Sequence, residues 1–121
     1  MKLLLALSLT TALFAGQAFA ACTAPGNSVS IPNGSKASKD DMVAAQQAVK
    51  AYDAAVKSFI ECLKKDQDAE IVAGGEKMTD EQKAKVAGRY ADRQNSEVDK
   101  LQKVADKFNA ELKAYKAKNP A

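Results

Sequence analysis

The fold is decided by residues 41–63, DMVAAQQAVKAYDAAVKSFIECL, in which apolar side chains alternate at intervals of three and four. The seam consists of Met42, Ala45, Val49, Tyr52, Val56, Phe59 and Leu63. This period is typical of a helix that packs against another helix in coiled-coil fashion. Ser38 is placed as the N-cap, and Gly74-Gly75 is a natural stop. We therefore expect a helix over about residues 39–72.

A second helical pattern begins at residues 79–82, Thr-Asp-Glu-Gln, which form a capping box. Its seam consists of Ala84, Ala87, Ala91, Gln94, Val98, Leu101, Ala105, Phe108, Leu112 and Tyr115. Only Gln94 is polar in this set. Because Asn119-Pro120 ends the pattern, we expect the helix over about residues 80–117.

A tight turn at Gly74-Gly75 makes the two helices antiparallel. Equal rise along both helices then places Ala45 near Phe108 and Tyr52 near Leu101. The predicted fold class is all-α: an antiparallel, coiled-coil-like two-helix hairpin over residues 39–118. Its second helix also carries large side chains off the main seam, at Val86, Tyr90 and Val104. We expect these three residues to form a second interface.

Residues 21–38 are rich in Pro, Gly, Ser and Asn, which disfavour a helix and suit an extended strap. The first helix offers this strap a stripe of small side chains: Ala44, Ala48, Ala51, Ala55, Ser58 and Cys62. Sixteen extended residues reach about 50 Å, whereas Ser38 to Cys62 along a helix spans about 36 Å. We expect the strap to return along this stripe. Its contacts would be Pro25, Val29, Ile31 and Pro32.

Residues 1–20 have the three parts of a secretory signal peptide. Lys2 is the charged start, residues 3–15 are the apolar run, and Ala18-Phe19-Ala20 is a small-x-small peptidase site. The apolar run is shorter than the roughly 20 residues of a membrane span. We expect cleavage between Ala20 and Ala21, and hence a periplasmic or secreted protein.

Lipid attachment at Cys22 is an alternative to this simple cleavage, because two alanines precede that cysteine. A lipid-attachment signal usually has a Leu-like residue three positions before the cysteine, where Phe19 stands. Lipidation would also leave Cys62 without a partner, since these two are the only cysteines of the chain.

The two cysteines of a small exported chain are most simply explained as one disulfide, Cys22 to Cys62. In the chain-entropy account, closing a loop of this length contributes about 4 kcal/mol. Two unpaired buried thiols are the first alternative. A redox pair is the second, although the cysteines lack the Cys-x-x-Cys spacing that lowers a thiol pKa.

The chain contains no His, so the commonest general base and metal ligand is missing. Asp66, Asp68 and Glu70 have the spacing of a calcium loop, but Ile71 stands where that loop needs Gly and Lys77 where it needs Glu. We expect no catalytic residues, no cofactor-binding residues and no metal ligands, and therefore no enzyme.

The chain is only slightly basic once Lys2 is removed, and its acids and bases are interspersed. This pattern argues against a nucleic-acid partner. The lysines of the second helix raise a further possibility, a membrane-active helix, but acids are nearly as frequent there and a clean basic face is missing. We expect no membrane binding.

Residues 22–63 share several features with a known group: Cys22, Pro25, the triplet Pro32-Asn33-Gly34, Met42, Ala45-Gln46-Gln47, Val49, Tyr52 and Cys62. In these features the chain resembles small secreted proteobacterial proteins that have a strap and a helical hairpin. The resemblance covers about a third of the chain. It implies the framework of strap and helix and carries over no active site.

The sequence favours a non-enzymatic protein of the periplasm or cell envelope that acts through protein–protein interaction or self-association. A two-helix hairpin covers only part of each seam, so a second copy or an envelope protein is the expected partner. The alternative is a stress-response holdase. That role calls for an exposed apolar or Met-rich surface, and the mature chain keeps only Met42 and Met78.

Overall fold

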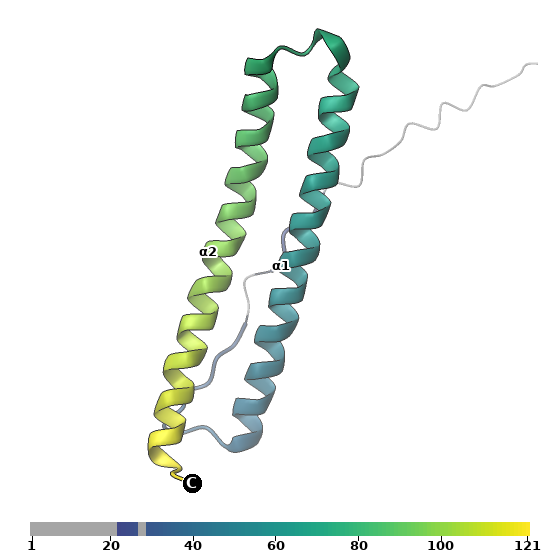
Figure 1. The fold of residues 1–121 in the computed structure, drawn as a ribbon. Helices are drawn as coiled ribbons and strands as arrows, with labels where there is room; N and C mark the ends of the chain where they lie inside the picture. Colours follow the sequence, from purple (N-terminus) through teal and green to yellow (C-terminus); the bar gives the residue numbers. More distant parts are fainter. Residues whose placement is uncertain (1–21, 27–28) are drawn as a thin grey trace, which may run out of the picture.

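The structure, a computed structural model, describes residues 22–26 and 29–121. Two long antiparallel helices, α1 (Lys39–Gly74) and α2 (Asp80–Lys118), are joined by a single 3-10 turn, η1 (Gly75–Lys77) (Figure 1). The predicted all-α hairpin is therefore confirmed. The expected signal peptide, residues 1–20, and its cleavage site at Ala20 and Ala21 lie outside the described residues.

Both helices begin at the capping residues that the sequence predicts. Ser38 Oγ accepts from the Asp41 backbone N–H at 3.1 Å, and Asp41 Oδ2 accepts from the Ser38 N–H at 2.9 Å. The Asp41 carboxylate accepts from both the Ser38 backbone N–H and the Ser38 hydroxyl, and these two hydrogen bonds lower its pKa. Thr79 and Gln82 make the matching exchange at the start of α2. At the other end of α1, Gly75 has a φ of 57°, which favours glycine and ends the helix.

The α1 half of the core follows the predicted seam. The buried residues of α1 are Met42, Ala45, Tyr52, Val56, Phe59 and Leu63, and Val49 is half-buried. Ala45 and Phe108, which were expected to face each other, pack in one cluster with Met42. The antiparallel register is therefore the one that equal helix rise predicts.

The predicted seam of α2 is wrong at alternate positions of its first half. Ala84, Ala91 and Val98 are exposed, whereas Ala87 and Gln94 are half-buried. The side chains that α2 buries are Val86, Tyr90, Glu97 and Phe108. Val86 and Tyr90 pack on Phe59 and Leu63 of α1, because these larger side chains remove more apolar surface from water than alanines would.

This rotation of α2 also overturns the expected second interface at Val86, Tyr90 and Val104. Val86 and Tyr90 belong to the interior of the hairpin itself, and Val104 is half-buried. An interaction surface must therefore be sought elsewhere on the hairpin.

The strap forms a third layer and returns along the two helices toward their middle (Figure 1). At its lower end, Asn33 Oδ1 accepts from the Ser35 backbone N–H at 3.1 Å and so shapes a turn. Gly34 is buried in this turn against α2, and its N–H donates to Glu111 Oε2 at 2.7 Å. Ile31 packs on the cluster around Phe108.

The strap follows the small-residue stripe of α1 only at the two ends of that stripe. Ser30 and Pro32 line a hollow with Ala44 and Ala48, and Cys22 is bonded to Cys62. Between these ends, Ala51, Ala55 and Ser58 remain exposed. The strap also contacts α2, where Gly34 lies against Glu111. Covering the groove between two helices buries more apolar surface than covering shallow alanines on one, which explains the difference.

Gly34→Ala is expected to displace the strap from α2. A Cβ at this position would stand 1.7 Å from the Glu111 carbonyl oxygen, and that backbone atom cannot swing away as a side chain can. We expect a loss of about 1–3 kcal/mol in the free energy of unfolding, measured by urea denaturation. The matched control is Gly26→Ala, whose Cβ meets nothing within 4 Å. Equal unfolding midpoints for the two variants would contradict the packing described.

Candidate interaction surface

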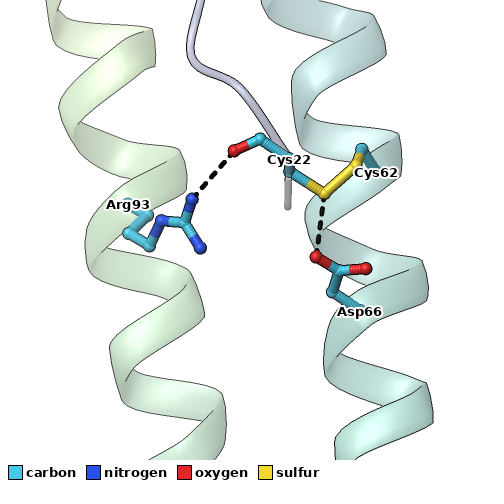
Figure 2. Close-up of a disulfide and its surroundings, with 4 residues drawn as sticks. All are labelled: Cys22, Cys62, Asp66 and Arg93. Carbon is cyan, nitrogen blue, oxygen red and sulfur yellow. Dashed lines mark hydrogen bonds between the residues drawn. A yellow bond between two sulfur atoms is a disulfide. The ribbon is translucent and has the colours of Figure 1, made fainter. Parts of the chain in front are cut away.

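The expected disulfide joins Cys22 to Cys62 and closes the upper end of the strap onto α1 (Figure 2). The two Cα atoms are 5.7 Å apart, and 40 positions separate the residues in sequence. Cys22 is buried and packs in the cluster of Phe59, Leu63 and Tyr90. A disulfide of this kind is typical of proteins that fold in an oxidising compartment outside the cytoplasm.

Two side chains flank this disulfide, one from each helix (Figure 2). Arg93 of α2 donates to the Cys22 carbonyl oxygen at 3.3 Å and lies over the Phe59 ring, so it ties the strap to both helices. Asp66 Oδ2 of α1 lies 3.0 Å from Cys22 Sγ. A disulfide sulfur has no proton to donate, so this is an oxygen–sulfur contact until the bond is reduced.

Asp66 and Glu70, two of the three acids with the spacing of a calcium loop, are engaged in other contacts. Cys22, Cys62 and Asp66 bring possible ligand atoms close together, but both sulfur atoms are held in the disulfide and offer no thiolate. In the acidic run, the Glu70 carboxylate pairs with Arg89 and accepts from Tyr90 Oη at 3.0 Å. These contacts tie the loop ends of the two helices together.

The Glu70 contacts predict a stability difference that depends on pH. The Arg89 guanidinium, followed by the Tyr90 hydroxyl, holds the pKa of the Glu70 carboxyl below its ordinary value of 4.5. Because the folded-state pKa is the lower one, this stabilisation is present above pH 4.5 and is lost as the pH falls through the folded-state value. Glu70→Gln should therefore destabilise the protein at pH 7 and progressively less toward pH 3, followed by thermal unfolding.

The control for this series is Glu61→Gln, at an exposed position of α1 that takes part in none of the ion pairs found among the described residues. The difference in unfolding temperature between this variant and the wild-type protein should be small and should not change over the same pH range. A flat profile for Glu70→Gln would contradict the role given to Arg89 and Tyr90.

A buried carboxylate lies at the middle of the hairpin, at a position outside the predicted seam of α2. Glu97 is 3% exposed, and its Oε1 atom accepts from Lys100 Nζ at 2.7 Å. That contact raises the pKa of Lys100. Glu97 Oε2 and the nearby Tyr52 Oη are buried and have no hydrogen-bond partner among the residues that the structure describes. The strap side of the groove is therefore polar at this height, between apolar clusters toward either end.

The two faces of the hairpin differ in what covers them. The strap covers one face, where it meets Arg93 and Glu111 of α2 and Cys62 of α1. The opposite face, which we call the strap-free face, holds an open groove between the helices. It is lined by Val49, Lys50, Asp53, Val98, Leu101, Gln102 and Ala105. Val98 is 45% exposed there.

The α2 side of the strap-free face carries no charge over seven helical turns. Its residues recur at intervals of three and four and are Ala84, Gly88, Ala91, Asn95, Val98, Gln102, Ala105 and Asn109. All are exposed except Ala105, which is half-buried. In a chain of which 27% is charged, such a stripe is unlike a solvated helix face, which normally collects the charges. It has the composition of a surface that another protein can cover.

Neither α1 nor α2 is apolar enough over a sufficient length to cross a membrane. No protein-family profile, no curated protein and no solved structure matches this chain. The resemblance to small secreted proteobacterial proteins therefore stays a prediction.

Proposed function

We propose that this chain is a non-enzymatic protein, exported to the periplasm or cell envelope, that acts by binding another protein chain through its strap-free face. The observation that carries the proposal is the contrast between the two faces. One face is closed by a strap and a disulfide, and the other presents an open groove whose α2 side, around Val98, carries no charge. Removing uncharged surface from water costs less than removing unpaired charges.

Export is supported by two independent features of the chain. Residues 1–20 have the composition of a secretory signal, and the Cys22–Cys62 disulfide suits an oxidising compartment. Expression of the full chain in a Gram-negative host, followed by intact-mass measurement of the periplasmic fraction, tests this part. A chain that begins at Ala21 and is two hydrogens lighter than its reduced form is expected. An uncleaved chain in the cytoplasm would overturn it.

The binding part is tested with a photo-crosslinking amino acid in place of Val98, in the same host. Val98 lines the strap-free groove, so irradiation should give one defined product of higher mass. The control places the same amino acid at Lys107, an exposed position on the far side of α2. Equal labelling from both positions, or none from either, would count against binding through this face.

A holdase role is the second candidate and has the weaker support. The described residues expose three large hydrophobic side chains, Val43, Val72 and Val98. Val43 and Val72 lie near opposite ends of α1, and Val98 lies midway along α2. Holding of unfolded chains calls for a contiguous apolar patch, which scattered valines do not supply.

A further inference from the structure

We propose that the partner on the strap-free face is a second copy of this chain, related by a two-fold axis parallel to the helices, so that α1 of each copy lies on α2 of the other. The proposal rests on the binding role proposed above and names its partner. It is carried by the charged residues at the two edges of the face.

The α1 edge of the strap-free face is a row of lysines. Lys50, Lys57 and Lys64 are exposed and follow one another at seven-residue intervals, which keeps them on one side of a helix. Lys50 lines the groove itself. Lys57 Nζ pairs at 2.7 Å with Asp53, another lining residue. The row therefore borders the groove along α1.

The α2 edge carries two aspartates with the same spacing, Asp99 and Asp106, which are exposed and form the aspartate row. Asp92, one heptad earlier, lies on the strap side, where it lines a hollow with Ala24 and Arg93. Asp106 Oδ1 accepts from Gln102 Nε2 at 2.9 Å, and Gln102 lines the groove. The strap-free face thus has a positive edge along one helix and a negative edge along the other.

Only one of the two simple two-fold arrangements makes these edges complementary. An axis parallel to the helices places the lysine row of each copy on the aspartate row of the other. The dimer therefore contains two such contacts. An axis across the helices places lysines on lysines and aspartates on aspartates, which is repulsive. The first arrangement also makes every pair of neighbouring helices antiparallel, as in a four-helix bundle.

The two rows also agree in height along the molecule. In the hairpin register, Lys50 lies level with Gln102, between Asp99 and Asp106, and Lys57 lies level with Asn95, about one helical turn from Asp99. The two-fold axis preserves these heights, so Lys50 and Lys57 each come within about one helical turn, roughly 5 Å along the axis, of an aspartate. The extended lysine side chain can cover that distance.

The surface between the rows can be buried without stranding a charge. Asp53 is the charged residue on the α1 side of the groove between the rows, and Lys57 already pairs with it. On the α2 side, Gly88 and Ala91 leave room for the close approach of a helix, and a Cβ at Gly88 would meet nothing within 4 Å. A second copy supplies both matching rows by symmetry, whereas an unrelated chain would need its own pair of rows at seven-residue spacing.

The test is sedimentation equilibrium of the oxidised protein from Ala21 to Ala121, with two charge-reversed double variants. Asp99→Lys/Asp106→Lys makes both edges positive, and Lys50→Glu/Lys57→Glu makes both negative. Each variant alone should dimerise about tenfold or more weakly than the wild-type protein, because like charges now meet. An equimolar mixture of the two should recover the dimer mass, because both contacts are then between opposite charges.

The matched control is Lys65→Glu/Lys107→Glu, which reverses two exposed lysines away from the strap-free face and should leave the dimer intact. Circular dichroism of every variant checks that the hairpin is folded. A wild-type protein that stays monomeric, or a mixture that stays monomeric, would overturn the proposal. If the wild-type protein is monomeric while Val98 crosslinks to another envelope protein, the second-copy partner is rejected and the proposed function stands. If both assays are negative, both are rejected.

Discussion

The double variant Cys22→Ala/Cys62→Ala is expected to lose about 4 kcal/mol of the free energy of unfolding, because its unfolded chain is no longer restricted by a closed loop. The disulfide spans 40 positions, and it is the cross-link that ties the N-terminal end of the strap to α1. A domain of about 100 residues has a total stability of roughly 5–15 kcal/mol, so the loss is a large share of it. Urea denaturation monitored by circular dichroism measures the effect.

The wild-type protein in the presence of a dithiol reductant serves as the control for this variant. Reduction should shift its unfolding midpoint nearly as far as the double substitution does. Limited proteolysis should then cut the strap while α1 and α2 stay intact. A midpoint that is the same with and without reductant would show that the hairpin does not depend on the disulfide.

Leu63→Ala should cost about 3 kcal/mol, within the 2–5 kcal/mol range for large-to-small changes in a packed core. Leu63 is fully buried and belongs to the cluster that joins Cys22, Phe59, Val86 and Tyr90. Shortening the Leu63 side chain removes its packing against the strap and against α2. The neighbouring disulfide limits how far the surrounding residues can move into the cavity that is left. Thermal and urea unfolding of the oxidised protein measure the cost.

Val72→Ala is the matched control, since Val72 lies on the same helix and is 78% exposed. Its stability should stay within about 0.5 kcal/mol of the wild-type value. A comparable loss at both positions would mean that the cluster around Leu63 is not the centre of the fold.

The buried face of α1 was predicted well because nearly all of its large apolar side chains lie on one face of the helix. Tyr52, Phe59 and Leu63 have no equally large apolar neighbour off the seam except Ile60, so a single helix face is clearly favoured. The capping residues Ser38 and Thr79 and the turn at Gly74-Gly75 were equally informative, because each satisfies local backbone groups whatever the tertiary contacts are.

The α2 prediction failed because two apolar patterns overlap in that helix. The regular pattern includes Ala84, Ala91 and Val98, but a heptad seam drifts by about 20° per repeat on a straight helix. Over four repeats, the N-terminal part of the pattern turns away from α1. Val86 and Tyr90 take that place, because they are larger and reach the cluster around Leu63.

The burial of Glu97 could not be predicted, because it depends on the strap as well as on α1. In a bare hairpin this side chain would lie at the edge of the groove in contact with water. The strap closes that edge, and Lys100 then supplies the compensating charge at 2.7 Å. The i, i+3 spacing of Glu97 and Lys100 was visible in the sequence, but such pairs are usually exposed.

The strap-free face was also not predicted, because it too depends on the position of the strap. The uncharged stripe and the two charged rows were all readable from the spacing of residues. Their meaning as one face depends on which side of the hairpin the strap covers, and that is set by tertiary contacts such as Gly34 on Glu111 and Arg93 on Cys22.

The strap places Cys22 far from the C-terminus of the chain. In a plain hairpin both ends emerge together at the open end. Here Cys22 is fixed beside Cys62, about 35 Å along the rod from the start of α1 at a rise of 1.5 Å per residue, whereas Ala121 follows the end of α2. A fluorophore near Cys22 and another at the C-terminus would therefore report on the flank and the tip of the molecule separately.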